Sequence, residues 1–415
     1  MNKEKNQLIL PKITNNNNNN NNNTIKNNKL SNHQNYNTEN LDINNIANPY
    51  FSHIPLSINQ NINQKTFNFD TVTITSEYNS GNLLNAEKIS EDTFNLYMSQ
   101  DCNGVELNHQ ISCYKVWFYF GVKSTIPQIL TLRIVNMNNY VKVFHSGNKI
   151  CYRILEENQT PYDYENSYKL NEENLWKRFD ENFSYKVNEN NNLELYLTYE
   201  FPQNKYVLFS YCFPFSYTKI QKFLDFYDNQ INTITKDTTN IYFHNEILTY
   251  SKEKRLLNLL TITSKDNIIK NQYETILAGL FPIRNRCYKS LHDKPIVVIS
   301  ARVHPGETPG QFMMNGLIKL LCDENNKYAK ILRRTFVFKI IPMINVDGVS
   351  KGHLRLDSQG LNLNRSYLNP ESKTELEIYA IKKLFMFYVN SFKVRYYFDL
   401  HADMKILGAY VFGKF

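Results

Sequence analysis

The chain has 415 residues, of which 42% are apolar, and this length and composition allow two globular domains with sizeable cores. Its formal net charge is +8, from 47 Lys and Arg against 39 Asp and Glu, and no single basic run accounts for it. A spread positive charge suits acidic protein substrates at least as well as nucleic acid. Since the sequence contains no RNA- or DNA-binding motif, we expect an acidic protein partner and no nucleic acid.

The six cysteines are scattered, with no CxxC pair and no spacing typical of a disulfide framework. This pattern predicts a reducing compartment. No apolar run is long enough to span a membrane, and the polar N-terminus lacks the apolar core of a signal peptide. We therefore expect a soluble, intracellular protein with no membrane partner.

Residues 1–48 are rich in asparagine, with an uninterrupted run from Asn15 to Asn23. Such a segment buries too little apolar surface to offset the entropy lost on ordering, so we expect it to be disordered. A self-associating, prion-like tract is the alternative interpretation.

Residues 66–212 contain mostly short β-type runs separated by turns rich in Asn and Gly. Their alternation and their β-branched and aromatic residues predict an all-β, antiparallel sandwich domain. The clearest runs are residues 71–75, 116–122, 130–135, 193–197 and 206–210. No cluster of candidate catalytic residues lies here, so we expect a structural or positioning domain.

Residues 213–415 show a different pattern, in which strand-like and helix-like segments alternate. This pattern predicts an α/β domain with a mixed sheet and flanking helices. The expected elements are an amphipathic helix near 218–227, strands at 257–263, 295–301, 335–344 and 394–400, and helices at 309–322 and 371–390.

His304, Glu307 and His401 are candidate metal ligands, because each follows the carboxyl end of a predicted strand, where sites of α/β sheets form. Two imidazoles and one carboxylate are a typical ligand set of catalytic zinc, which keeps a fourth position open. We also expect Thr308 to cap the following helix, with Gln311 completing a capping box. The alternative is an ordinary polar loop, since a bare His-x-x-Glu arises often by chance.

A loop rich in Gly, Asn and Asp follows the strand that ends near residue 344, and it carries Arg355, Asn364 and Arg365. A carboxypeptidase must bind a free terminal carboxylate, which a guanidinium does with two parallel hydrogen bonds. It must also stabilise a developing oxyanion with a positioned cation. The alternative is that both arginines are solvated loop charges.

These motifs resemble the zinc carboxypeptidase family, and within it the cytosolic carboxypeptidase branch. The similar stretches include Arg302–Pro309, Gly352–Tyr367, Tyr396–His401 and, upstream, Phe213–Tyr217, so that the resemblance covers about residues 66–415. It implies a β-sandwich followed by an α/β carboxypeptidase domain. It also implies Zn²⁺ as the cofactor.

The resemblance implies a role for each matching residue. His304, Glu307 and His401 take the zinc-ligand positions, Arg355 that of the arginine that polarises the scissile carbonyl, and Asn364 and Arg365 those of the pair that binds the substrate's terminal carboxylate. Asn362 stands where secreted relatives carry an aspartate that orients the first histidine. Asp399, which shares a strand face with His401, is expected to orient a ligand in the same way.

The resemblance further implies removal of glutamates from acidic protein tails, such as those of polyglutamylated tubulin. It implies a cytoplasmic, cytoskeleton-associated location and leaves the nucleus open. Lys351, His353 and Lys405 are candidates for contact with a glutamate side chain, or are simply exposed loop charges. The preferred glutamate linkage and the oligomeric state are not determined by the sequence.

The family's general-base glutamate lies downstream of the third ligand, and this chain offers no matching residue. We therefore expect a C-terminally truncated chain with an incomplete α/β sheet, inactive as written. Two other functions stay open, a non-catalytic binder of glutamate-rich tails and an aspartoacylase-type deacylase.

Overall fold

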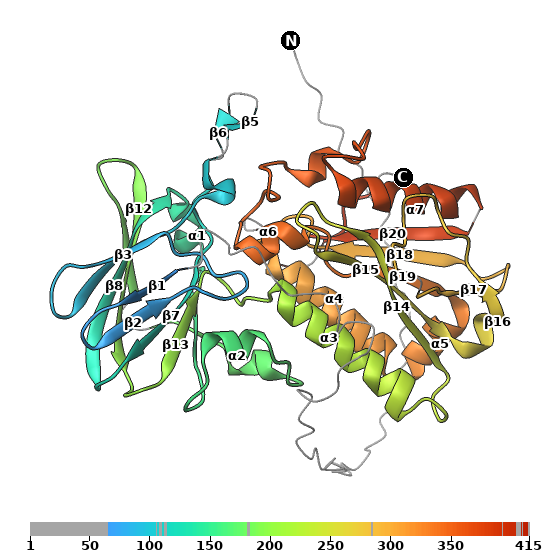
Figure 1. The fold of residues 1–415 in the computed structure, drawn as a ribbon, viewed down its shortest axis with the longest axis horizontal. Helices are drawn as coiled ribbons and strands as arrows, with labels where there is room; N and C mark the ends of the chain where they lie inside the picture. The colour runs from blue at the N-terminus through green and yellow to red at the C-terminus, as the bar shows by residue number, and fades with distance from the viewer. Residues whose placement is uncertain are drawn as a thin grey trace, which may run out of the picture. The chain divides into compact units, whose positions relative to one another are not determined.

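The computed structural model describes residues 65–413, apart from 105, 108, 109, 112, 113, 181, 182, 284, 392, 404–407 and 409. The prediction of disorder for residues 1–48 lies outside this range. Within it, no helix combines the length and the apolar character that crossing a bilayer requires. The described residues form a β-rich part followed by an α/β part (Figure 1).

The β-rich part contains two facing sheets. The first has the strand order β1-β2-β7-β13-β9-β10 and the second β11-β12-β8-β4-β3. All neighbouring strands described in these sheets run antiparallel except β4 and β8, which are parallel. The strands are β1 Thr66–Asn68, β2 Val72–Thr75, β3 Asn85–Lys88, β4 Thr93–Tyr97, β7 Tyr119–Ser124, β8 Gln128–Asn138, β9 Cys151–Ile154, β10 Lys177–Arg178, β11 Phe183–Val187, β12 Asn192–Phe201 and β13 Tyr206–Ser210.

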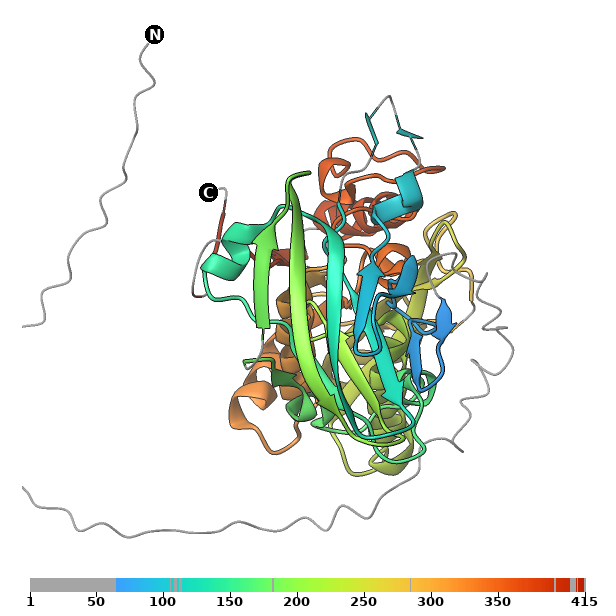
Figure 2. The same ribbon diagram turned by 90° about the vertical axis from the view of Figure 1, so that its left-hand side faces the viewer.

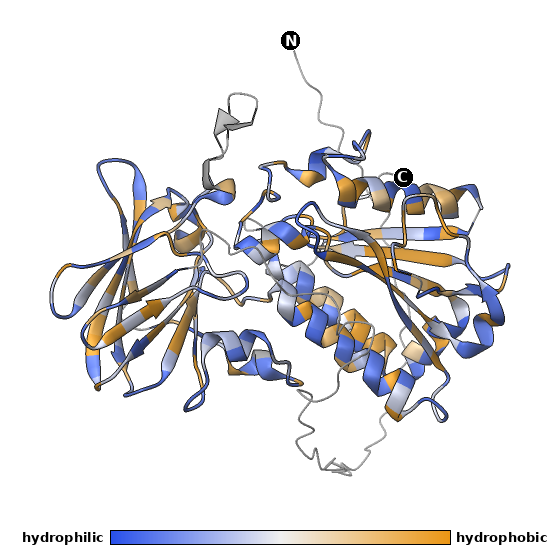
Figure 3. Ribbon diagram, viewed as in Figure 1, coloured by the Kyte–Doolittle hydropathy of each residue, from blue (hydrophilic) through white to orange (hydrophobic). Residues whose placement is uncertain are grey.

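Alternating side chains hold these two sheets together. Along β8, Leu130, Leu132 and Ile134 are fully buried, while their neighbours in the strand are more exposed. Figure 3 shows the same alternation of hydrophobic and hydrophilic residues along the strands, and Figure 2 shows one sheet face on. Because a strand presents successive residues to opposite faces, this pattern buries one face of each sheet in a common core. The predicted sandwich fold is present.

Smaller elements join the strands of the β-rich part. These are α1 Val141–His145, α2 Pro161–Glu165, the short pair β5 Glu106–Leu107 and β6 Gln110–Ile111, and a 3₁₀-helix Asp101–Gly104.

The α/β part is built on a mixed sheet with the order β14-β15-β19-β18-β20 among the described residues. β14, β15 and β19 run antiparallel, and β19, β18 and β20 run parallel. The strands are β14 Ile241–Tyr250, β15 Leu256–Ser264, β18 Ile296–Ala301, β19 Val337–Ile341 and β20 Val394–Leu400, with a separate pair β16 Ile268–Tyr273 and β17 Tyr288–Ser290. The helices are α3 Tyr217–Asn229, α4 Thr308–Leu321, α5 Lys327–Thr335, α6 Val346–Lys351 and α7 Leu376–Asn390.

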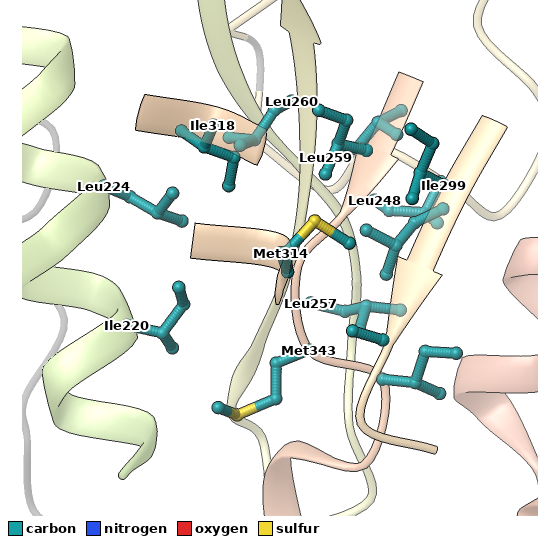
Figure 4. Packing of buried hydrophobic residues seen from close by; sticks show 14 of the residues in the cluster. Ile220, Leu224, Leu248, Leu257, Leu259, Leu260, Ile299, Met314, Ile318 and Met343 are labelled. Carbon is teal, nitrogen blue, oxygen red and sulfur yellow. The ribbon is translucent and has the colours of Figure 1, made fainter. Parts of the chain in front are cut away.

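Helices cover both faces of this sheet, with α3 and α4 on one side and α7 on the other (Figure 1). Figure 4 shows side chains of α3 and α4 pointing toward those of β15 and β18 within one buried cluster. On the side of α7, the fully buried Lys339 donates to Thr261 Oγ1 and to Glu274 Oε2, each at 2.9 Å. Tyr388 of α7 donates to the same carboxylate at 2.7 Å, so a buried ion pair sits under this helix.

The predicted helices and strands of the α/β part are present, with shifted ends. Strand β19 is shorter than the predicted 335–344, because Thr335 ends α5, where its hydroxyl donates to Ile331 O at 2.8 Å. Helix α7 begins at Leu376 rather than near 371, because the Glu375 side chain accepts from the backbone N–H of Glu371 at 2.6 Å and closes a turn there. Strand β14 and helices α5 and α6 were not predicted.

Candidate metal centre

Two neighbouring parallel strands bring the predicted metal ligands together. In the pairing of β18 with β20, Ala301 lies opposite Leu400, and each is the last residue of its strand. His401 follows Leu400 directly, and His304 follows Ala301 by three residues, so both histidines emerge at the same edge of the sheet. The two histidines are 97 positions apart in the sequence, and the pairing of β18 with β20 brings them close together in space.

His304, Glu307 and His401 face one another closely enough to share one ion. Nδ1 of His304 lies 2.7 Å from Glu307 Oε1, and Nδ1 of His401 lies 2.9 Å from Glu307 Oε2. One ligand atom from each of the three residues falls within 4.8 Å of the others. The backbone N–H of Ala402 also donates to Glu307 Oε2, at 3.0 Å, which fixes the carboxylate between the two rings.

The outer nitrogen of each imidazole has its own acceptor. Nε2 of His304 donates to Asn362 Oδ1 at 3.2 Å, and Nε2 of His401 donates to Asp399 Oδ2 at 3.0 Å. The hydroxyl of Ser300 donates to the other oxygen of Asp399 at 2.9 Å, which holds that carboxylate in turn. Both rings are thereby oriented with Nδ1 toward Glu307, which is how the outer partners of metal-bound histidines act.

The charges of the site favour a bound cation. Burial acts to raise the pKa of Glu307, but the hydrogen bonds from His304 and His401 outweigh it and bring this pKa down to about 2. The hydrogen bonds to Asp399 and to Glu307 raise the pKa of His401 to about 10. Two carboxylates therefore favour positive charge on the His401 imidazole, and a divalent ion between the Nδ1 atoms and Glu307 would supply such a charge directly. The donor set fits zinc.

The loop that carries the first two ligands enters α4 differently from the prediction. The helix includes Thr308, Glu307 is its N-cap residue, and that residue makes no side-chain capping hydrogen bond. The predicted capping box of Thr308 and Gln311 is therefore wrong. Glu307 uses its carboxylate for the two histidines, and the Thr308 hydroxyl lies 3.3 Å from Cys212 Sγ instead.

Asn364 and Arg365 are attached to the metal centre through a short 3₁₀-helix, Leu363–Arg365. Asn362 Oδ1, which accepts from His304, also accepts from the backbone N–H of Asn364 at 3.1 Å. Leu363 is fully buried and anchors the turn, whereas Arg365 is exposed and donates only to the Asn364 carbonyl, at 3.1 Å, among its described contacts. The turn thus leaves the Arg365 guanidinium accessible to a ligand.

Arg355 lies in an irregular segment that also reaches the metal loop. Its neighbour Leu354 accepts, through its carbonyl, a hydrogen bond from the Gly306 N–H at 2.7 Å. The Arg355 side chain is half-buried, and its backbone N–H donates to the carboxylate of Asp101 at 2.9 Å. Sequence reasoning missed Asp101, because nothing in the run Asp101–Gly104 indicates a partner in the distant α/β part.

Two of the three candidates for glutamate side-chain recognition are engaged elsewhere. Lys351 forms an ion pair with Glu253 at 2.6 Å. His353 is buried, and its two nitrogens contact the Cys102 N–H and the carbonyls of Leu356 and Asp357. The structure therefore contradicts a direct ligand role for His353, because its ring is enclosed by backbone groups. Lys405 lies outside the described residues.

Comparison with known sequences places this site in a family. A sequence profile of the zinc carboxypeptidases matches residues 227–407. The chain is 31% identical over 346 residues to cytosolic carboxypeptidase-like protein 5 of Mus musculus, which covers 75% of this chain and 37% of that protein. It is 28% identical over 351 residues to cytosolic carboxypeptidase 6 of the same species, covering 83% of this chain and 55% of the relative. The chain thus spans little more than a third of the first relative.

Comparison with solved structures gives the same fold. A putative carboxypeptidase A from Shewanella denitrificans superposes with a TM-score of 0.56 at 20% identity, over 80% of this chain and 70% of that one. A metallo-carboxypeptidase from Burkholderia cenocepacia has the same TM-score and identity, over 81% of this chain and 72% of its own. At this identity the likeness concerns the fold alone, and it includes both parts of the chain.

Proposed function

Because residues 227–407 match the zinc carboxypeptidase family, we propose that the site binds the carboxyl-terminal glutamate of acidic protein tails and serves to remove it. The observation that carries this proposal is the convergence of His304, Glu307 and His401 beside the turn that bears Asn364 and Arg365. A metal ligand set and a carboxylate-binding pair are then joined by one residue, Asn362. This is what release of a terminal residue requires.

Each residue of the site has its own role in the proposed reaction. When bound, zinc would supply a Lewis acid and would lower the pKa of water toward about 7. Glu307 and the two Nδ1 atoms would hold the ion, while Asn362 and Asp399 accept the Nε2 hydrogens on the far side of the rings. Arg355 polarises the scissile carbonyl.

The terminal carboxylate of the substrate is the natural ligand of Arg365 and Asn364. The exposed guanidinium presents parallel N–H donors to two carboxylate oxygens. The net charge of +8 favours approach of an acidic tail. Polyglutamylated tubulin in the cytoplasm is such a partner, and the names of the relatives agree with a cytosolic location.

Among the described residues, we find no free carboxylate beside the two imidazoles that could act as a general base and take a proton from water. Glu307 and Asp399 are the carboxylates that contact the two imidazoles, and both are already hydrogen-bonded on each oxygen. General-base assistance is worth about 10²–10⁴-fold. We therefore infer that the 415-residue chain binds its ligand but turns it over slowly. A non-catalytic binder of glutamate-rich tails is the second candidate function, and it rests on this same observation.

Peptide binding to the zinc-loaded chain tests the proposal. The ligand is a fluorescent peptide that ends in four glutamates, and its matched control is the same peptide with an amidated C-terminus. Loss of a charge-assisted contact should weaken binding by roughly 10- to 100-fold. We expect amidation to have this effect and Arg365→Ala to remove the difference between the two peptides.

Equal affinity for the free and amidated peptides would contradict the proposal. Glutamate release, measured in the same samples, separates the two candidate functions. Release that disappears in Glu307→Gln identifies the enzyme, whereas tight binding without release identifies the binder.

A further inference from the structure

A buried carboxylate of the β-sandwich holds the segment that contains Arg355. Asp101 is 2% exposed and accepts hydrogen bonds from three successive backbone N–H groups. Its Oδ1 accepts from Leu354 at 2.8 Å, and its Oδ2 accepts from Arg355 at 2.9 Å and from Leu356 at 3.1 Å. Asp101 is itself fixed, because its own N–H donates to the Tyr114 carbonyl at 2.8 Å.

The three N–H groups depend on this carboxylate. Leu354, Arg355 and Leu356 belong to no helix or strand, so their N–H groups have no ladder partners. A buried N–H without an acceptor is costly, and a carboxylate is a stronger acceptor than a neutral group. Removing the carboxylate should therefore release this segment rather than leave it in place.

The residue after Asp101 strengthens the same contact. The N–H of Cys102 donates to Nε2 of His353 at 3.1 Å, and its thiol donates to the Asp357 carbonyl at 3.0 Å. Cys102 has φ 63°, a value that costs a non-glycine residue energy and persists only where surrounding contacts impose it. Together, Asp101 and Cys102 contact every residue from 353 to 357.

The same segment is joined to the metal loop on its other side. The peptide of Leu354 donates its N–H to Asp101 and accepts, through its carbonyl, from Gly306. A Cβ on Gly306 would lie 2.8 Å from that carbonyl oxygen, so the two loops touch without room for a side chain. Arg355 is therefore held between the sandwich and the loop that carries His304 and Glu307.

We propose that Asp101 is a positioning residue for Arg355, so that the β-sandwich is part of the substrate site rather than a support for the fold alone. This inference rests on the proposed function, since it takes from it the role of Arg355 at the scissile carbonyl. A shift of about 1 Å in a catalytic group costs on the order of 10²-fold. Loss of the three hydrogen bonds should cause a shift of that size.

Other contacts between the sandwich and the α/β part provide a matched control. The Ser80 hydroxyl donates to the Val349 carbonyl at 2.7 Å, which ties the sandwich to α6 without contacting residues 353–357. Ser80→Ala thus removes a buried contact between the same two parts and leaves the Arg355 segment alone.

The experiment measures binding of a phosphinic analogue of glutamyl-glutamate, in which a phosphinate replaces the scissile amide, to the zinc-loaded chain by calorimetry. The variants are Asp101→Asn, Asp101→Ala, Arg355→Ala, the Asp101→Asn/Arg355→Ala pair and Ser80→Ala. Zinc content and thermal unfolding are measured for each. Hydrogen exchange of the amides of residues 354–356 reports the segment directly.

We expect Asp101→Asn to weaken binding by roughly 10- to 100-fold, with one zinc per chain retained. The double variant should bind no worse than Arg355→Ala, because a residue that acts through Arg355 has nothing left to position. Amides 354–356 should exchange faster in both Asp101 variants. Ser80→Ala should change stability and leave the affinity and these amides unchanged.

Additive losses in the double variant, or unchanged exchange in both Asp101 variants, would overturn the inference. If Asp101→Asn does not fold, the exchange rates of amides 354–356 in Asp101→Ala test the inference: faster exchange supports it, and unchanged exchange contradicts it. A wild-type chain that binds zinc but not the analogue would overturn the proposed function, and the inference with it. A loss in Arg355→Ala without one in Asp101→Asn would overturn the inference alone.

Discussion

The candidate metal ligands and the proposed substrate-binding residues are positioned by different means. His304 and His401 follow the ends of two adjacent parallel strands, so the sheet register sets their distance. Arg355 lies in irregular backbone, and Asn364 and Arg365 lie in a single 3₁₀ turn; these segments are held by the side chains of Asp101 and Asn362. One sheet thus brings the candidate metal ligands together, whereas the proposed substrate site also depends on contacts from the β-sandwich. We therefore predict that substitutions outside the site displace Arg355, Asn364 and Arg365 more easily than they displace the two histidines.

The sandwich packs closely against Gly352, the residue that follows α6, and a side chain there should have the largest effect on stability. Gly352 has φ 70°, and a Cβ would lie 2.6 Å from the Ser80 carbonyl oxygen. Gly352→Ala should lower the free energy of unfolding by about 2–5 kcal/mol, from backbone strain and overpacking together. Gly147→Ala is the control, since Gly147 has φ 89° but nothing within 4 Å. If both variants lose the same stability in thermal unfolding, the loss comes from backbone strain, and overpacking at Gly352 contributes nothing.

The outer partners of the two histidines should affect zinc more than substrate. Asp399→Asn removes a carboxylate that accepts from His401 and should weaken zinc binding by roughly 10- to 100-fold, measured by competition with a chelator. Asn362→Asp is the reverse change at His304 and should tighten zinc binding, because a carboxylate raises the basicity of the ligand. Changes of the same sign in the two variants would contradict this account of the outer shell.

The smallest effect is expected at Lys351, whose ammonium pairs with Glu253 and whose side chain is 20% exposed. Lys351→Ala should change the free energy of unfolding by about 1 kcal/mol or less, because solvent reaches both side chains and screens the pair. It should leave affinity for the glutamate peptide unchanged. A tenfold loss of that affinity would reinstate Lys351 as a contact for the substrate.

The sequence predicted that His304, Glu307 and His401 lie together, but it did not predict the contacts around them, and the reason is physical. Buried strands such as residues 296–301 and 394–400 have clear apolar patterns, and ligands at their carboxyl ends follow from the rules of α/β sheets. The capping of α4 was wrong because Glu307 and Thr308 have other partners, which local sequence cannot show. Asp101 was missed because its acceptor role depends on residues more than 250 positions away.

The boundaries of the domains and the catalytic roles of the named residues stay predictions. The sandwich and the α/β sheet have separate hydrophobic cores. The two parts are joined by polar contacts of Ser80, Asn82 and Asp101. These contacts join residues that are far apart in the sequence. Periodicity therefore indicates the helices and strands of each part but not the contacts between the two parts.

The central claim is that Nδ1 of His304, Nδ1 of His401 and the carboxylate of Glu307 converge on one zinc ion. X-ray absorption at the zinc edge, with metal content measured on the same sample, tests it most directly. We predict one zinc per chain with two imidazole ligands at about 2.0–2.1 Å and oxygen ligands in the remaining positions. One imidazole should be lost in His401→Ala. A spectrum without histidine scattering, or one that His401→Ala leaves unchanged, would contradict the account.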